Sequence, residues 1–338
     1  MIMKSDKILL DHGSGGKASH KLITELFLPS FHNSFLAELD DCAVITIPGK
    51  NLAFSTDSYV VDPIFFPGGD IGSLAIYGTV NDLAMRGAKP LYLSVGLIIE
   101  EGFSLADLKR IIQSMKGAAE EANIQIVTGD TKVVPSKAAD KIFINTSGVG
   151  VIPEGINISG KNSQPGDKII INGYIGDHGI TILTQRSGMN FDTSLESDSA
   201  PLNHLVADMI AASRQIHTLR DPTRGGVATS LNEISLQSQV GIKLYEDALP
   251  IRNEVRGVCE LLGLDPLYIA NEGKLIATVS SDDADTLLAA MRNNKYGSGA
   301  CIIGEVIANF AGKVMMQTAI GGTRIVDMLT GEQLPRIC

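Results

Sequence analysis

Four aspartates in the first half of the chain have the chemistry and the placement of metal ligands. Asp41, Asp57 and Asp130 stand at or beside the ends of predicted strands, and Asp82 interrupts an apolar helical pattern together with Asn81. A buried carboxylate without a partner is costly, so these positions call for one. Separate carboxylates that converge on a phosphate group suit Mg²⁺, which shares oxygen ligands with water and phosphate. The alternative is that each aspartate only caps a helix or shapes a turn.

The chain ends in PRIC, and its last residue, Cys338, is the one cysteine outside an apolar setting. Cys42, Cys259 and Cys301 lie in apolar stretches and are predicted to be core residues. No CxxC pair or Cys/His ligand spacing occurs, so neither a zinc site nor a disulfide framework is predicted. A thiol on a terminal tail could react with or carry a substrate, or it could be an accidental exposed cysteine.

The segment DHGSGGK near the N-terminus contains Ser14, Gly15, Gly16 and Lys17. Glycines allow backbone amides to approach an anion closely. The segment is not a Walker A loop, and no GxGxxG fingerprint occurs in the chain. It is either a phosphate-binding loop or a flexible N-terminal arm.

Two further groups of polar residues lie in the second half. Arg224, Gly225 and Gly226 in RDPTRGGV precede a predicted helix, whose N-terminus could face a phosphate, although a plain turn explains them equally. His178 in GDHG and Glu272 in NEGK are candidates for proton transfer. The alternatives are a capped surface histidine and a glutamate at the end of a helix or strand.

Strands and helices alternate along most of the chain, which predicts an α/β fold with helices packed on sheets. In the first half, Asp70 and Ser104 are predicted to cap two helices. The predicted strands of this half are 42–48, 51–58, 90–100, 124–134 and 141–152. The second half is predicted to contain strands at 168–176, 241–246, 274–280, 300–307 and 313–319, and helices after 179, near 202–216, after 226, over 253–263 and after Ser281.

This pattern predicts two domains joined at a turn-rich segment. The expected parts are an N-terminal glycine-rich arm (1–36), a first domain (37–155), a second domain (165–318) and a flexible tail (321–338). The net charge of −10 disfavours nucleic acid and anionic membrane surfaces as partners. No apolar run reaches the roughly 20 residues of a membrane span and no signal peptide is evident, so a cytoplasmic protein is expected.

Taken in order, HGSGGK, FSTDSYVVDPIFFPGGDIG, GTVNDLAMRGAKP, VTGDTKVV, GDHG, DPTRGGV, NEGK and PRIC resemble the HypE carbamoyl dehydratases. These enzymes mature [NiFe] hydrogenases and belong to the PurM-like ATP-binding superfamily. The resemblance runs from about His12 to Cys338. It implies a two-domain PurM-like fold with an N-terminal ATP-binding domain, a homodimer, ATP and Mg²⁺ as cofactors, HypF as carbamoyl donor and the HypC–HypD complex as cyanide acceptor.

The resemblance also implies a role for each candidate residue. Cys338 would carry the carbamoyl group that is dehydrated to a thiocyanate, Glu272 and His178 would transfer protons, and Lys132 would contact phosphate. Asn81 would orient the helix end of the site. The glycine-rich arm and the second-domain turn would approach the nucleotide through Ser14, Gly15, Gly16, Lys17, Arg224, Gly225 and Gly226. The implied ligands of the Mg²⁺–ATP complex are Asp41, Asp57, Asp82 and Asp130.

Two other functions stay open at this point. A different PurM-like ATP user, such as a small-molecule kinase or synthetase, would explain the aspartates but not PRIC. A binding module in which Cys338 docks a metal or a partner would explain the tail but not the aspartates. Lipid attachment fits poorly, because a prenylation box needs three residues after its cysteine.

Overall fold

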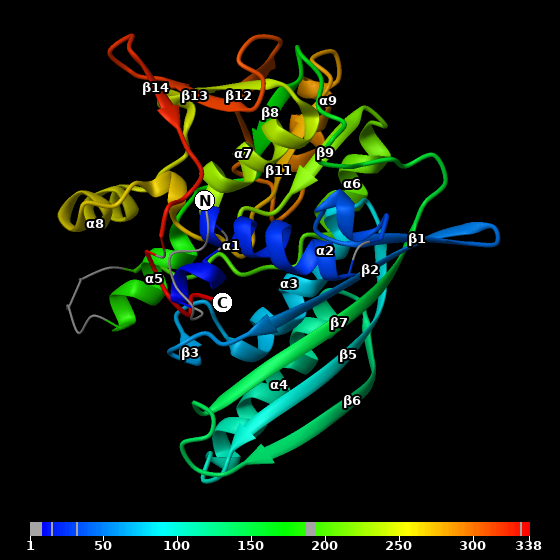
Figure 1. Cartoon of the computed structure of the whole chain (residues 1–338), viewed down its shortest axis with the longest axis vertical. Helices are drawn as coiled ribbons and strands as arrows, with labels where there is room; N and C mark the ends of the chain where they lie inside the picture. Colours follow the sequence, from blue (N-terminus) through cyan, green and yellow to red (C-terminus); the bar gives the residue numbers. More distant parts are fainter. Residues whose placement is uncertain (1–8, 15, 32, 187–193, 332) are drawn as a thin grey trace.

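The computed structural model describes residues 9–14, 16–31, 33–186, 194–331 and 333–338. The chain forms two halves, each built on its own sheet (Figure 1). The α/β architecture predicted from the alternating pattern is confirmed. None of the described helices is both long enough and apolar enough to cross a membrane.

The first half contains a five-stranded sheet in the order β1-β2-β7-β5-β6. Helix α3 packs on one face of this sheet, and α4 packs beside α3. The other face has no helix on it in Figure 1. The elements are β1 (Ala43–Ile47), β2 (Lys50–Tyr59), β3 (Phe65–Phe66), β4 (Gly69–Asp70), α3 (Ile71–Met85), β5 (Lys89–Glu100), α4 (Leu105–Glu121), β6 (Gln125–Val134) and β7 (Ile142–Ile152).

Local signals place the two helices of this half. The side chain of Asp70 accepts hydrogen bonds from the backbone amides of Gly72 (2.8 Å) and Ser73 (3.0 Å), and Ser104 accepts one from Asp107 (3.2 Å). Both predicted N-caps are therefore confirmed. Helix α3 is buried along nearly its whole length, so the polar residues it carries must be accommodated inside the protein.

The second half contains a seven-stranded sheet in the order β14-β13-β10-β12-β8-β11-β9. Its interior strand β8 is buried on both faces, because Ile170 packs into one apolar cluster and Ile169 and Ile171 into another. The elements are β8 (Lys168–Ile171), α5 (Asp177–Arg186), α6 (Asn203–Ala212), β9 (Ile216–Arg220), α7 (Gly226–Ser238), β10 (Gly241–Tyr245), η4 (Glu246–Ala248), α8 (Asn253–Leu262), η5 (Pro266–Tyr268), β11 (Ile276–Val279), α9 (Ala284–Arg292), β12 (Cys301–Ile307), β13 (Lys313–Gln317) and β14 (Thr323–Val326).

Two strands of this sheet were not predicted. Strand β9 begins at Ile216, so helix α6 ends four residues earlier than the predicted range. Strand β14 lies inside the segment expected to be a flexible tail, where Thr323–Val326 pairs with β13 in antiparallel register. Edge strands this short carry little periodicity, and their partner strand supplies most of what stabilises them.

Short helical turns precede the first sheet, and one of them, which begins at Lys17, lies against the chain's C-terminal segment. They are η1 (Leu10–Gly13), α1 (Lys17–Leu22), η2 (Ile23–Phe27), α2 (Leu28–Phe31) and η3 (Leu36–Glu38). The backbone amide of Lys17 donates to the carbonyl oxygen of Leu329 (2.9 Å), and Lys17 Nζ pairs with Asp327 (3.2 Å). The segment that begins at Lys17 and the C-terminal segment therefore lie side by side.

Candidate active site

A cavity of about 270 Å³ lies between the two halves of the chain and contains six of the residues singled out from the sequence. Its described walls carry six acidic side chains, two arginines and the terminal cysteine. The lining residues are Asp41, Ser55, Thr56, Asp57, Gly78, Asp82, Arg220, Asp221, Thr223, Arg224, Ser230, Glu233, Glu272 and Cys338.

The first domain supplies three aspartates from separate elements. Asp57 lies on β2, Asp82 on the buried helix α3, and Asp41 in the segment before β1. Ser55, two residues before Asp57 on the same face of β2, donates to Asp82 (2.6 Å) and to the backbone carbonyl of Asp41 (3.2 Å). One serine therefore connects these acidic positions.

The second domain adds an aspartate that the sequence analysis missed. Asp221 directly follows strand β9 and lines the same cavity. It stands at the end of its strand, as Asp130 was expected to do, but the strand itself went unrecognised. The neighbouring Arg220 pairs with Asp41 (3.1 Å) and with Glu233 (2.5 Å), which joins the two domains across the cavity.

Four acidic side chains of the cavity, those of Asp41, Asp82, Asp221 and Glu272, have pKa values raised toward the neutral form. Burial is the main cause; it raises the pKa of Asp41 to about 8 and that of Asp221 to about 6. Burial and repulsion from Asp221 and Asp57 raise the pKa of Asp82 well above its usual value. Such clustered acids would bind a cation strongly once ionised.

Cys338 lies in this cavity and is buried, with 9% of its surface exposed. Its negative charge is the largest cause that raises the pKa of Arg224, so the two groups are electrostatically coupled. Its carbonyl oxygen accepts a hydrogen bond from the amide of Val60 (2.9 Å). The predicted tail is therefore docked in this structure, with the sulfur-bearing residue inside the site.

Glu272 is buried in the same wall, and burial raises its pKa well above the usual value. Its Oε1 atom has no hydrogen-bond partner among the described residues. Asn81 on α3 donates to the Glu272 carbonyl (3.2 Å) and the Ala200 carbonyl (3.0 Å). Asn81 thus links the two domains and fixes Glu272, instead of lining the cavity.

His178 is completely buried, which excludes the alternative of a surface histidine. Its Nδ1 is hydrogen-bonded to Ser197 Oγ (2.7 Å) and its Nε2 to the backbone carbonyl of Ile337 (2.8 Å). Burial lowers the pKa of His178, so the ring is held neutral. His178 contacts the tail one residue before Cys338; its role in proton transfer stays a prediction.

The glycine-rich candidates lie next to the cavity instead of inside it. Ser14 and Gly225 line a small hollow with Arg224 and Ile337. Gly225 and Gly226 have φ values of +78° and +62°, the left-handed region that favours glycine, so this turn needs both. Gly16 and Lys17 pack on the tail, and Gly15 lies outside the described residues. Their contact with phosphate stays a prediction.

Asp130 and Lys132 are not brought to the cavity by a single chain. They pair with each other on β6 (2.8 Å), and about two thirds of each side chain is exposed. The strand register explains the separation, because Asp130 lies opposite Gly96 on the open face of the sheet. Asp57 instead lies opposite Thr146, which is buried under α3. Their part in nucleotide binding stays a prediction.

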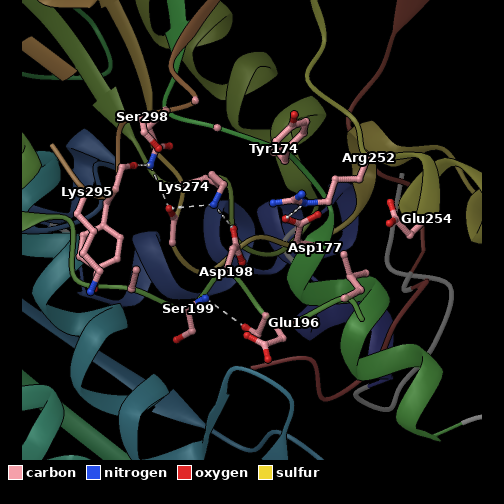
Figure 2. Close-up of a pocket in the computed structure, with 18 of the residues that line it drawn as sticks. Tyr174, Asp177, Glu196, Asp198, Ser199, Arg252, Glu254, Lys274, Lys295 and Ser298 are labelled. Carbon is pink, nitrogen blue, oxygen red and sulfur yellow. Dashed lines mark hydrogen bonds and ion pairs between the residues drawn. The ribbon is translucent and has the colours of Figure 1, made fainter. Parts of the chain in front are cut away.

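A second cavity, of about 510 Å³, lies behind Glu272 in the second domain (Figure 2). Lys274 pairs with Asp198 (2.9 Å), and Arg252 pairs with Asp177 (2.9 Å). Asp198 also accepts a hydrogen bond from the amide of Glu272 (3.0 Å). None of the candidate site residues is among the described residues that line it. This cavity is therefore separate from the candidate active site.

Comparisons with known proteins agree with this arrangement. Family models of AIR synthase related proteins match residues 39–152 (N-terminal domain) and 164–317 (C-terminal domain). The carbamoyl dehydratase HypE of Cupriavidus necator is 56% identical over 337 residues, which cover 99% of this chain and 96% of that protein.

Two solved structures are also closely similar. A HypE in complex with ATP has a TM-score of 0.83 and 54% identity and covers 98% of this chain and 100% of its own. The HypE of a HypE–HypF complex has a TM-score of 0.87 and 50% identity over 91% of this chain and 99% of its own. With a cysteine-ended tail docked between two AIR synthase related domains, the chain belongs to the HypE carbamoyl dehydratase family.

Proposed function

We propose that the protein dehydrates a carbamoyl group carried on its own Cys338, in a reaction that consumes ATP. The observation that carries this proposal is the location of Cys338. The residue that would carry the substrate lies in the same cavity as Asp57, Arg224 and Glu272. A kinase acting on a diffusible substrate would not need a cysteine there, and a binding module would not need the carboxylates.

The chemistry follows from the two functional groups. Conversion of the thiocarbamate S–C(=O)–NH₂ to the thiocyanate S–C≡N removes the carbonyl oxygen and two protons from nitrogen. Oxide is a very poor leaving group, so ATP would supply a phosphoryl group to that oxygen, which then departs as phosphate with ADP as the other product.

Residues of the chain would provide the proton transfer and the charge compensation. Glu272 presents a buried oxygen without a hydrogen-bond partner, and its raised pKa makes its carboxylate a stronger base than an exposed one. Arg224 places a positive charge beside Cys338, where it would stabilise the negative charge that develops on the oxygen. Asn81 holds Glu272 in position by donating a hydrogen bond to the Glu272 backbone carbonyl.

The donor set of the cavity suits Mg²⁺. Carboxylate oxygens are the ligands this ion prefers, and Asp41, Asp57, Asp82 and Asp221 come from four different segments. Among the described residues, no three such side chains are arranged to hold an ion by themselves. We infer that phosphate oxygens and water complete the coordination, so the metal would bind together with the nucleotide.

The raised pKa values predict a specific pH dependence. Because Asp41 and Asp221 hold their protons more tightly in the folded protein, the stability of the unliganded protein should fall as pH rises above their ordinary pKa of 3.8. The loss due to Asp221 should be complete at about pH 6 and that due to Asp41 at about pH 8. Affinity for Mg²⁺ and nucleotide should rise over the same interval, since the ligands must be ionised. Calorimetric unfolding with and without Mg²⁺ and nucleotide measures both trends, and Asp221→Asn should flatten them. A level stability profile in the wild-type protein would contradict this prediction.

The reaction would form part of [NiFe] hydrogenase maturation, with HypF as carbamoyl donor and HypC–HypD as cyanide acceptor in the cytoplasm. Incubation with HypF, carbamoyl phosphate and ATP tests the proposal directly. Intact-mass spectrometry should show the chain gaining one carbamoyl group and, when ATP is present, losing one water. Turnover of ATP that is indifferent to carbamoylation would instead favour an unrelated kinase or synthetase.

We further propose that the protein is a homodimer that covers the open face of the first sheet. This face carries exposed apolar side chains from neighbouring strands, including Phe54, Tyr92 and Ile98. A helix-free apolar sheet face is normally covered by another layer. A second copy would also bring Asp130 and Lys132 toward the cavity of its partner, which accounts for a pair that one chain leaves outside.

A complementation experiment tests this arrangement. Asp82→Asn and Asp130→Asn should each abolish turnover when present in every chain. If a site combines Asp82 of one copy with Asp130 of the other, a mixed dimer contains one intact site. Random exchange of the two variants should then restore about a quarter of the wild-type activity.

The matched control mixes Asp82→Asn with Asp57→Asn. Both residues belong to the same chain's cavity, so every site in the mixed dimer is damaged and no activity should return. Failure of the first mixture to recover, or a monomeric mass by light scattering, would contradict the dimer proposal.

A further inference from the structure

We propose that Asp140, His178 and Arg186 form a tail clamp that positions Cys338 for dehydration and whose release exposes the thiol. The inference rests on the proposed function for its catalytic consequence, but the clamp itself can be measured without any turnover. Its three residues hold the backbone of the last residues and the side chain of Arg336, not the sulfur of Cys338.

Arg186, at the C-terminal end of α5, makes the most extensive contact with the tail. Its guanidinium donates from Nη1 and Nη2 to the carbonyl oxygens of Pro335 and Arg336, and from Nε to the carbonyl oxygen of Asp62. The planar fork of an arginine suits several acceptors held at fixed spacing. One side chain thus ties the second domain to the first domain and to the tail.

His178, at the other end of α5, holds the next peptide group. Its Nε2 donates to the carbonyl oxygen of Ile337 (2.8 Å), because a carbonyl oxygen can only accept; Nδ1 of the neutral ring then accepts from Ser197 Oγ. Helix α5 therefore holds three consecutive carbonyl groups, those of residues 335 to 337. The amide of Val60 on the first domain then holds the carbonyl of Cys338.

The backbone of Arg336 has an uncommon conformation, which these contacts stabilise. Its φ is +53°, in the left-handed region that non-glycine residues rarely adopt. Its side chain donates to the carbonyl oxygen of Val60 (2.9 Å) and pairs with Asp140 on the loop after β6. An uncommon conformation persists where the surroundings fix it from several sides, as they do here.

The geometry of the clamp suits a carrier that must dock with different loads. Backbone carbonyls look the same whether Cys338 is free, carbamoylated or converted to a thiocyanate, so the clamp can receive all three forms. The Arg336–Asp140 pair is partly exposed, with 31% and 49% of the two side chains accessible. Exposed ion pairs contribute little stability each, which keeps docking reversible.

The test measures the rate at which iodoacetamide alkylates Cys338 in the full-length protein, by peptide mass spectrometry. Arg186→Gln should speed this alkylation by at least roughly tenfold, because hydrogen bonds from a charged group to the tail are lost. Arg186→Lys keeps the positive charge but not the planar guanidinium, so its alkylation rate should lie between those of the wild-type protein and Arg186→Gln. Arg256→Gln, on the exposed face of α8, is the matched control and should leave the rate unchanged.

The same variants separate positioning from loading. With Arg186→Gln, HypF should load Cys338 at the wild-type rate or faster, whereas dehydration of the loaded protein should slow by at least roughly tenfold. If Arg186→Gln is alkylated faster but the wild-type protein forms no thiocyanate, the proposed function is refuted and the clamp is not.

Two observations guard against a general loss of folding. The buried Cys42 and Cys259 should stay as protected in Arg186→Gln as in the wild-type protein. Asp140→Asn changes a partly exposed loop residue and should also speed alkylation of Cys338, by a smaller factor. Unchanged alkylation of Cys338 in both Arg186→Gln and Asp140→Asn would overturn the tail clamp.

Discussion

Cys338→Ala is expected to abolish both carbamoyl loading and thiocyanate formation while leaving nucleotide binding intact. The sulfur would be the only attachment point of the substrate, so no residual activity should remain. The nucleotide, by contrast, would be held by Asp41, Asp57, Asp82 and Asp221, which line the same cavity but belong to segments outside the tail. Intact-mass spectrometry after incubation with HypF, carbamoyl phosphate and ATP measures the first effect, and titration calorimetry measures the second.

The matched control is Cys301→Ala, which removes a half-buried cysteine from β12 in the second sheet. This variant should gain the carbamoyl group and then lose one water, as the wild-type protein does. A mass change that persists in Cys338→Ala, or that maps to Cys42, Cys259 or Cys301, would show that the tail is not the carrier.

Asp82→Asn should lower ATP turnover by at least about 100-fold, the effect typical of removing one charge-stabilising group from an active site. Asp82 is surrounded by Asp41, Asp57 and Asp221, whose charges raise its pKa together with burial. An amide there removes a metal ligand but relieves the repulsion. The unliganded variant should therefore melt at a higher temperature than the wild-type protein above neutral pH, while it binds Mg²⁺ and nucleotide weakly.

Asp285→Asn, an exposed substitution in the first turn of α9, is the control for the loss of one negative charge. It should change neither turnover nor the response to Mg²⁺. Wild-type turnover in Asp82→Asn would remove this residue from the proposed site, and a lower melting temperature would contradict the account of repulsion.

Helix starts and core cysteines could be predicted from sequence because their causes are local. Asp70 and Ser104 cap helices through amides two or three residues away, so a window of a few residues contains the whole interaction. Cys42 and Cys259 are buried, as their apolar neighbours predicted, whereas Cys301 is half-buried at the end of its strand. The family could also be recognised, because ordered motifs are a property of the sequence itself.

Contacts between residues distant in sequence decided the features that the sequence did not predict. Asp221 was missed because β9 is stabilised by its pairing with β11, which short-range patterns do not reveal. Asp130 and Asp57 were both expected beside strand ends, yet the structure places Asp130 inside β6, where the register with β5 turns it to the opposite face of the sheet. A shift of one position along a strand exchanges the two faces, so sequence spacing alone cannot decide which face a carboxylate occupies.

The tail shows most clearly what the sequence determines and what the folded structure adds. Its sequence determined that a thiol stands at the end of the chain, but its own residues predicted no ordered structure. Only the tertiary structure decided that Cys338 is buried, because the groups that hold the tail are Val60, His178 and Arg186 from two other parts of the chain. Docking of a segment depends on its receptor as much as on its own residues, and the receptor exists only after both domains have folded.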